Sequence, residues 1–523
     1  MRLNNFLQGI NTRYIPNLIP DNACQYAENV NLATGSLTNI KQLKAAAKAS
    51  NKIPYYYKGK WGYYNEGSTF AETNEVLYIA DGEQLKKTLD GETIYDLVIE
   101  GPIYAPSVNA TENDGNVGGE NISYCYTYYN ERDGSESSPS AFSPDITVGE
   151  WTTSGSDTVW TGSKTVEVGN IIASNDPQVT HIRVYRKSSV QSNYNLVAEL
   201  LNETVTIIDN ADDYTASIGS KLYTYGYNIK VERNLTPPFN GRYIVAYEGT
   251  IFAAGTGKNS NWLYNSESYS PYLWGTGATK FDEEITGVGV ISAGILVFTK
   301  YKTYILYGSV GSFSKQVLLP STGCINGMSI RNMSTGCIWQ ATDGYYLYQN
   351  GLSNITYEKL AYINLKPIIS CASDDESYYA LQEDGKILVI NSRLNMAIYY
   401  FTAENCTGIH VGDGKLHCCD GKNLLSYSGD NANIKFTSKQ YTEQGISMYK
   451  NFKTIYVYSE GNLKMKVYID NRLAADVKLD KQGLNEVKVD QANRTGYYMW
   501  FEIEGQGSVK EIEFIAEARQ NGR

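Results

Sequence analysis

Histidine is scarce in this chain of 523 residues, which contains three copies of it. Three histidines leave little room for a Ser-His-Asp triad, and the Gly-x-Ser-x-Gly turn that presents a serine nucleophile is missing. No run of 18 apolar residues occurs, which argues against a transmembrane helix. The start, MRLNNFLQGINTRYIP, lacks the apolar segment of a signal peptide. The sequence therefore predicts neither a membrane anchor nor a serine hydrolase.

Basic residues are also in deficit. The chain has 45 Lys and Arg against 56 Asp and Glu, a formal net charge of −11. Proteins that grip nucleic acid through its phosphates carry a basic excess, because neutralised phosphates supply most of their affinity. We therefore expect that any DNA this protein meets slides past it and is not held.

Tyrosine and glycine are abundant, with 45 and 47 copies, and the hydrophobic fraction is 42%. Such a composition favours short strands joined by tight turns, and it disfavours helix bundles and Rossmann-like folds. At roughly 150 residues per domain, the length suggests about three domains. The eight cysteines follow no disulfide framework and are interpreted as reduced, buried thiols. They are residues 24, 125, 324, 337, 371, 406, 418 and 419.

A strand–turn–strand unit recurs along the chain. It appears at 76–87, 251–268, 296–308, 337–351, 378–390 and 416–429, with turns at Gly82, Gly257, Tyr301, Gly344, Gly385 and Gly421. The later intervals are 44, 43, 41 and 36 residues, close to the roughly 40 to 50 residues of a four-stranded propeller blade. The first interval, 175 residues, fits one blade plus an insertion of about 125. The pattern predicts six blades.

Two further segments alternate apolar and polar residues as strands do. The insertion, with strands at 122–140 and 179–210, predicts a fibronectin- or Ig-like β-sandwich, and 452–519 predicts another. The predicted fold is all-β: a roughly six-bladed β-propeller with an inserted β-sandwich and a C-terminal β-sandwich. The predicted boundaries are 1–103 (N-terminal strands and first blade), 104–228 (inserted sandwich), 229–430 (remaining blades) and 431–523 (C-terminal sandwich).

The densest group of metal-ligand types lies late in the chain. It comprises Cys406, His410, His417, Cys418 and Cys419, without a Cys-x2-Cys pair. Strand alternation sends His417 and Cys419 to one face and Cys418 to the other, so we expect buried thiols and no zinc.

Other candidate sites are weaker still. Gly255–Asn259 lacks the spacing and hydroxyl of a phosphate loop and is interpreted as a hairpin turn. The acidic runs Asp282–Glu284 and Asp374–Glu376 could supply a catalytic carboxylate pair, but adjacent acids in polar loops are usually solvated. His181 is interpreted as a hydrogen-bonded strand histidine. We therefore assign no catalytic, cofactor-binding or metal residues, expect no cofactor, and expect no enzymatic activity.

Three segments, in this order, resemble one protein family. They are GINTRYIPNLIPDNACQYAENVNLATGSLTNIK (9–41), THIRVYRKS…YNLVAEL…IIDN (180–210) and PPFNGRYIVAYEGTIFAAGTGKNSNWLYNSESYSPYLW (237–274). The chain resembles the tail nozzle proteins of short-tailed bacteriophages, also called tubular tail protein B and related to packaged-DNA stabilisation proteins. The likeness is one of pattern and extends over most of residues 1–430.

The resemblance implies a structural virion protein. Six subunits would form a ring at the distal end of the tail, stacked on an adaptor ring, with tail fibres or spikes as further partners. The ring would retain the packaged DNA and pass it on ejection without binding it specifically. The protein would assemble in the bacterial host cytoplasm. The tail nozzle family carries no catalytic motif that could be transferred to this chain.

Two other classes remain open. A tail adhesin or depolymerase would bind host surface glycan, and a depolymerase would need an exposed carboxylate pair in a cleft. A cellular propeller acting as an interaction platform would be expected to show Gly-His and Trp-Asp blade signatures, which are missing here.

Overall fold

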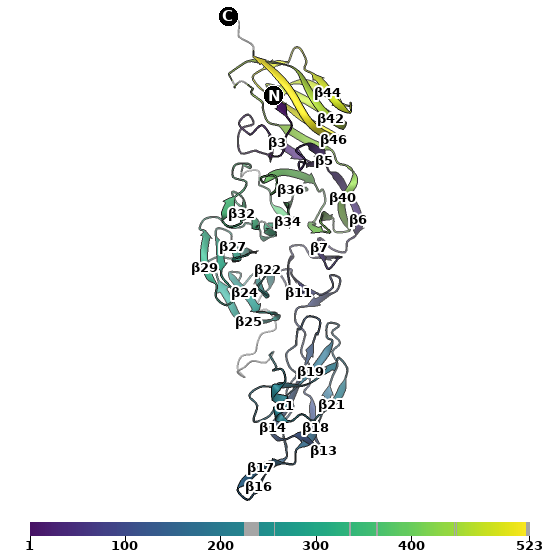
Figure 1. The fold of residues 1–523 in the computed structure, drawn as a ribbon, viewed down its shortest axis with the longest axis vertical. Helices are drawn as coiled ribbons and strands as arrows, with labels where there is room; N and C mark the ends of the chain where they lie inside the picture. The colour runs from purple at the N-terminus through teal and green to yellow at the C-terminus, as the bar shows by residue number, and fades with distance from the viewer. Residues whose placement is uncertain are drawn as a thin grey trace. The chain divides into compact units, whose positions relative to one another are not determined.

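The computed structural model describes residues 1–223, 240–255, 257–333, 336–361, 365–443, 445 and 447–518. The chain divides into two compact units, one made of residues 1–68 and 283–523 and the other of residues 69–282 (Figure 1). Within the described ranges, helix is confined to α1 (Asp213–Ile218) and a 3-10 turn at Gly327–Ser329. The all-β prediction is therefore confirmed.

Six groups of four antiparallel strands form the propeller blades; five are separate sheets, and the sixth, β34–β37, is the end of a 15-stranded sheet. In the second unit they are β9 (Thr69–Thr73), β10 (Val76–Ala80), β11 (Leu85–Thr88) and β12 (Ile94–Asp96), then β22 (Gly241–Tyr247), β23 (Thr250–Gly255), β24 (Trp262–Glu267) and β25 (Ser270–Lys280). The first unit contains four blades. The first of them is β26 (Ile285–Ile291), β27 (Gly294–Thr299), β28 (Thr303–Tyr307) and β29 (Ser314–Leu319), and the second is β30 (Arg331–Met333), β31 (Gly336–Ala341), β32 (Gly344–Tyr348) and β33 (Leu352–Asn354). Its last two blades are β34 (Ile368–Ser373), β35 (Ser377–Gln382), β36 (Lys386–Asn391) and β37 (Ala397–Thr402), and β38 (Gly408–Gly412), β39 (Lys415–Cys419), β40 (Asn423–Asn431) and β6 (Lys41–Lys48).

The six predicted turns mark these blades. Every one lies where the second strand of a blade connects to the third, so the six-blade prediction is confirmed. Gly82, Gly385 and Gly421 have φ of +92°, +76° and +82°. Glycine adopts this left-handed backbone without steric cost, which explains why Asp-Gly marks these turns.

The last blade combines both ends of the chain. Its strands β38, β39 and β40 are consecutive, but the fourth, β6, comes from the N-terminal region and pairs with β40 from Lys48↔Asn423 to Lys41↔Asn431. The hairpin β7 (Ile53–Tyr57) and β8 (Lys60–Tyr64) follows β6 and contacts β38.

The inserted sandwich consists of two sheets. One contains β13 (Ser107–Val117), β18 (Lys164–Ile171) and β21 (Val205–Asp209); the other contains β15 (Ile146–Val148), β14 (Gly119–Tyr129), β19 (His181–Lys187) and β20 (Asn195–Leu201). Their inner faces share one apolar core, which includes Val117, Tyr124, Val166 and Ile182. A separate hairpin, β16 (Glu150–Ser154) and β17 (Asp157–Thr161), extends from this sandwich (Figure 1).

The C-terminal sandwich is built around two strands of 20 residues. These are β42 (Lys450–Ile469) and β46 (Met499–Ala518), accompanied by β41 (Ile434–Ser438), β43 (Arg472–Leu479), β44 (Gly483–Lys488) and β45 (Thr495–Gly496). Alternate residues of both long strands are buried, as the period-2 pattern predicted.

The N-terminal strands lie elsewhere than the sequence suggested. These short strands, which the predicted boundary 1–103 assigned to the propeller, are β1 (Arg2–Leu3), β2 (Gly9–Ile10), β3 (Ala23–Glu28), β4 (Val30–Asn31) and β5 (Leu37–Asn39). β1 and β5 pair with β46, and β3 pairs with β41; β2 and β3 also pair with the blade strand β37. The reason is packing, since Leu3 and Val30 are buried in one core with Phe501. Strand periodicity shows which face is apolar but not which partner covers it.

Candidate functional site: the N-terminal loop and its surroundings

The Cys/His group is spread over different surroundings. His410 and His417 face each other across β38 and β39, and the ring of His417 lies 4.6 Å from that of Trp61. Cys418 lies in the apolar core with Cys406, whereas the Sγ of Cys419 lies 3.2 Å from the carbonyl oxygen of Asn51.

This arrangement sets the chemistry of the group. Burial lowers the pKa of His410 to about 3, and hydrogen bonding to Cys406 together with burial raises the pKa of the Cys418 thiol. Over the described ranges, no three His, Cys, Asp or Glu side chains are grouped so that they could hold a metal ion.

The other candidates occupy structural positions. Asp374 Oδ1 accepts hydrogen bonds from the amides of Glu376 and Ser377, and Glu376 pairs with Arg393 at 2.5 Å. Asp282–Glu284 lies in the connection between β25 and β26, and Gly255–Asn259 in that between β23 and β24, although Thr256 is outside the described residues. His181 Nδ1 lies 2.9 Å from Thr180 Oγ1 at the start of β19.

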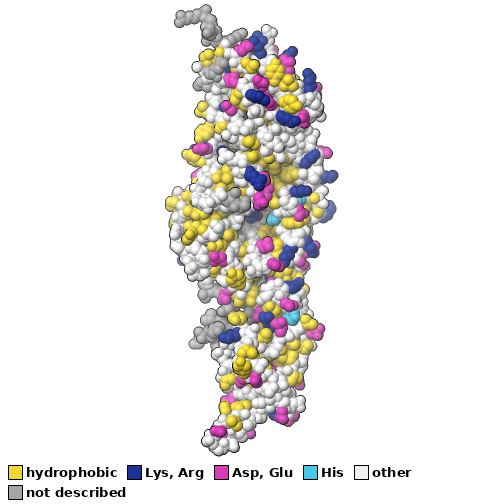
Figure 2. Space-filling model, viewed as in Figure 1, with side chains coloured by type: hydrophobic (Ala, Val, Ile, Leu, Met, Phe, Trp, Pro, Cys, Tyr) yellow, Lys and Arg dark blue, Asp and Glu magenta, His cyan; other side chains and the backbone are white. Residues whose placement is uncertain are grey.

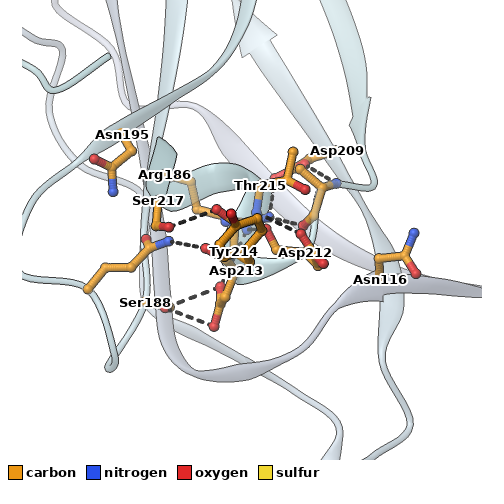
Figure 3. A network of polar contacts seen from close by, with 12 residues as sticks. Asn116, Arg186, Ser188, Asn195, Asp209, Asp212, Asp213, Tyr214, Thr215 and Ser217 are labelled. Carbon is orange, nitrogen blue, oxygen red and sulfur yellow. Dashed lines mark hydrogen bonds and ion pairs between the residues drawn. The ribbon is translucent and has the colours of Figure 1, made fainter. Parts of the chain in front are cut away.

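The inserted sandwich contains a buried charge network around Arg186 (Figure 3). The side chain is fully buried, and Nη1 lies 2.7 Å from Asp209 Oδ2, which also accepts the hydroxyl of Tyr124 at 2.9 Å. Further guanidinium bonds reach the carbonyl oxygens of Ala211 and Asp212 next to α1. Because these groups tie β19 to β21 and α1, we interpret the network as structural.

A second charged group lies at the junction of the fifth blade and the N-terminal strands. The buried Glu28 carboxylate accepts hydrogen bonds from Tyr26 and from Thr402 (2.8 Å), and it lies 3.1 Å from Lys386 Nζ. Burial alone would raise the pKa of Glu28, but these hydrogen bonds outweigh burial and leave it below the ordinary value. A cavity of about 530 Å³ adjoins the carboxylate. Glu28 therefore clamps β3 to β36 and β37 as an ionised, fully engaged group.

The N-terminal loop, residues 11–22, is held firmly at several points. The amides of Thr12 and Arg13 donate to the carbonyl oxygen of Lys359 at 2.7 and 3.2 Å. The amide of Gln440 donates to Pro16, and Lys439 Nζ pairs with Asp21 at 2.7 Å. The loop is therefore part of the frame of the first unit.

This well-anchored loop nevertheless exposes large apolar side chains. Tyr14, Ile15 and Leu18 are 47%, 61% and 67% exposed, and Tyr357, which packs under the guanidinium of Arg13, is 57% exposed. We call these four residues the loop surface. Single exposed apolar residues are ordinary, but a group of them on an ordered loop is typical of an interaction site. The sequence did not single out these residues, because no local pattern marks an apolar side chain as exposed.

Surface charge is mixed over much of the molecule, but residues 41–60 form a basic tract with six Lys and no Asp or Glu, and β6 within it is almost wholly exposed. Acidic and basic side chains are intermixed on the face drawn in Figure 2. Many are paired, such as Lys464 with Asp476 and Lys510 with Glu460. No helix in the described part of the chain is long and apolar enough to cross a membrane.

Comparisons with known proteins show similarity of structure only. No family model matches the chain, and no curated protein matches its sequence. BamB from Moraxella catarrhalis is 8% identical with a TM-score of 0.29, over 74% of this chain and 98% of that one. AztD from Citrobacter koseri is 11% identical with a TM-score of 0.27, over 60% of this chain and 97% of that one. Glutaminyl cyclase from Myxococcus xanthus is 10% identical with a TM-score of 0.23, over 36% of this chain and 88% of that one. Similarities this low carry no inference about what the chain does.

Proposed function

We propose that this protein is the ring-forming subunit of the tail nozzle of a short-tailed bacteriophage, a conduit that retains packaged DNA and passes it on ejection. The proposal starts from the ordered sequence resemblance. The observation that carries it further is the loop surface: residues 9–41, the first resembling segment, contain Tyr14, Ile15 and Leu18, exposed on an anchored loop.

A ring needs the same subunit contact to repeat until it closes. Such a heterologous contact joins two different surfaces of neighbouring copies, and both must keep their geometry for the ring to close. The loop surface meets this requirement because hydrogen bonds to Lys359 and Gln440 fix its backbone. Covering an apolar side chain stabilises association by about 1 kcal/mol or more.

The charge of the chain suits a conduit. The net charge of −11 leaves the protein with an overall deficit of the cations that hold phosphates. Each phosphate neutralised along a channel would add salt-sensitive affinity and slow the passing DNA. In the proposed ring, acidic and amide side chains line the lumen, and the adaptor ring and tail fibres bind at the outer faces.

A structural role without catalysis is also part of the proposal. Two of the acids that could form a catalytic pair are engaged elsewhere, Asp374 in a turn and Glu376 with Arg393. These contacts support a non-enzymatic function because catalysis needs a carboxyl group free to accept or deliver a proton.

Native mass measurement tests the proposal. The wild-type protein should form a species of six copies of 58.2 kDa. The double substitution Ile15→Ser/Leu18→Ser should shift it toward monomers without lowering the thermal unfolding midpoint, since both side chains are mostly exposed. Ile208→Ser, at a 57% exposed position in the inserted sandwich, is the matched control and should leave the hexamer intact.

Two results would count against the proposal in different ways. A native species of one or three copies, or hydrolysis of host polysaccharide, would overturn the nozzle function. A hexamer that survives the double substitution would show that the subunit contact lies away from the loop surface.

A further inference from the structure

The hairpin β16–β17 is the most isolated sheet in the second unit. Its five residue pairs, from Glu150↔Thr161 to Ser154↔Asp157, form a two-stranded sheet that pairs with no other strand in the described ranges. The turn contains Gly155 with φ of +69°. A lone hairpin is at best marginally stable in water, so something beyond its own ladder must hold it.

Trp160 supplies that anchor. Its indole Nε1 donates a hydrogen bond to the carbonyl oxygen of Val148 at 2.9 Å. Gly118 and Gly149 make room for the ring, since an added Cβ there would lie 2.8 and 2.5 Å from Nε1. The base of the hairpin is thereby fixed to the sandwich.

Trp151 is held in place but left open. It lies opposite Trp160, and the two rings meet edge to face at 5.1 Å and 89°. Trp151 nevertheless remains 61% exposed. One indole therefore anchors the hairpin and orients the other, whose surface is presented to solvent.

Hydroxyl groups surround the presented ring. Thr153 and Thr158 share its face of the hairpin, because residues two apart point the same way, and their Oγ1 atoms lie 3.3 Å apart. Both residues are exposed. Residues 146–163 contain Glu150 and Asp157 but no Lys or Arg. The surface combines an aromatic ring with polar, uncharged side chains and a weakly acidic surrounding.

We propose that the Trp151–Thr153–Thr158 face is a binding site for a neutral polysaccharide. An indole offers a flat apolar face to the C–H groups of a pyranose ring, and its negative potential attracts their slightly positive hydrogens. Threonine hydroxyls donate to and accept from sugar hydroxyls.

Other ligand classes fit this face less well. Phosphates and nucleic acids need cations that residues 146–163 lack, and Glu150 and Asp157 repel anionic glycans and anionic lipids. A stable protein partner needs about 800 Å² per side, more than one exposed indole on a 12-residue hairpin provides. The site goes beyond the nozzle function and does not depend on the ring.

Titration of the full-length protein with four neutral hexasaccharides tests the site: cellohexaose, maltohexaose, chitohexaose and mannohexaose. Calorimetry should detect binding of at least one of them. Trp151→Ala should weaken that binding by about tenfold or more, and Trp151→Phe by less, because an aromatic face remains. Tyr214→Ala, which removes another exposed ring (75%) from the same sandwich, should leave the affinity unchanged.

Each contrary outcome is distinct. The site is disproved if none of the four sugars binds at about 10 mM, or if Trp151→Ala binds as well as the wild type. If the protein sediments with phosphatidylcholine–phosphatidylglycerol vesicles in a way that depends on Trp151, the ligand of this face is a membrane surface and the glycan site is disproved. If Trp151→Ala changes the native mass, the face binds another copy of the chain and the glycan site is likewise disproved.

Discussion

Lys87 and Asp133 form one of the most buried ion pairs in the second unit. Their side chains are 1% and 3% exposed, and Lys87 Nζ lies 2.6 Å from Asp133 Oδ2 and 2.9 Å from Ser135 Oγ. Desolvation lowers the pKa of Lys87, with the Asp133 charge opposing the shift. The pair connects a blade strand, β11, to the loop that follows β14 in the inserted sandwich.

Removing one partner should destabilise the second unit strongly. Lys87→Met should lower its free energy of unfolding by about 3 to 5 kcal/mol, because the Asp133 carboxylate is left buried without a counter-charge. Lys87→Met/Asp133→Asn should recover part of the loss. Urea denaturation of the four proteins in a double-mutant cycle measures the coupling, and additive effects would contradict it.

His410 should make the first unit sensitive to acid. Its pKa in the folded protein, about 3, lies below the ordinary 6.5, mainly through burial, with Arg331 and His417 adding repulsion. The unfolded chain therefore binds the proton first, so stability is complete above pH 6.5 and is lost as the pH falls toward 3.

The measurement compares thermal unfolding of the wild type and His410→Gln between pH 6.5 and 5. The wild type should lose about 1 to 2 kcal/mol more than the variant over this range. Parallel curves for the two proteins would show that His410 does not titrate as described.

At the scale of residues, the sequence could predict properties that depend on the alternation of side chains along a single strand. It separated Cys418 from His417 and Cys419 because neighbouring residues of a strand face opposite ways. It could not find the Glu28 clamp, since Lys386 lies in the blade strand β36, more than 350 positions away. Nothing local marked Leu18 as exposed, because exposure depends on what the rest of the chain leaves uncovered.

At the scale of elements, local hairpins were predictable and distant pairings were not. The Asp-Gly turns identified the blades because a tight turn fixes the register of the two strands beside it. β6, KQLKAAAK, carries no strand signal, since alanine and lysine are depleted in sheets. It becomes a strand because β40 offers an unpaired edge.

The β6 strand should control the stability of the last blade. Ala45→Pro/Ala47→Pro removes two backbone donors from the strand that pairs with Leu425 and Leu424. The exchange of amide hydrogens in β39 and β40 should accelerate by about 100-fold or more, corresponding to about 3 kcal/mol. Ala45→Ser/Ala47→Ser keeps the donors and should change exchange little. Unchanged exchange in the proline variant would show that three strands suffice.

At the scale of the whole molecule, the fold class followed from repetition, whereas the function rests on resemblance and remains a proposal. The proposal predicts how the protein treats DNA. Isolated protein should show no measurable affinity for duplex DNA at about 150 mM salt, weaker than the ~10⁻⁴ to 10⁻⁶ M of nonspecific binders. Fluorescence anisotropy with a labelled duplex measures this. Binding that strengthens steeply as salt is lowered would contradict the conduit.

The pairing of both chain ends has a consequence for synthesis on the ribosome. The contact of Lys48 with Asn423 cannot form until 375 more residues have been synthesised, and that of Arg2 with Glu511 until 509 more have been. At about 5 to 20 residues per second, the gap before β6 meets β40 lasts about 20 to 75 s. The strands of the inserted sandwich, between residues 107 and 209, pair with one another, so their partners are synthesised within about 100 residues of each other. The first-made segment is thus among the last to fold, and during that delay chaperones have access to its apolar residues.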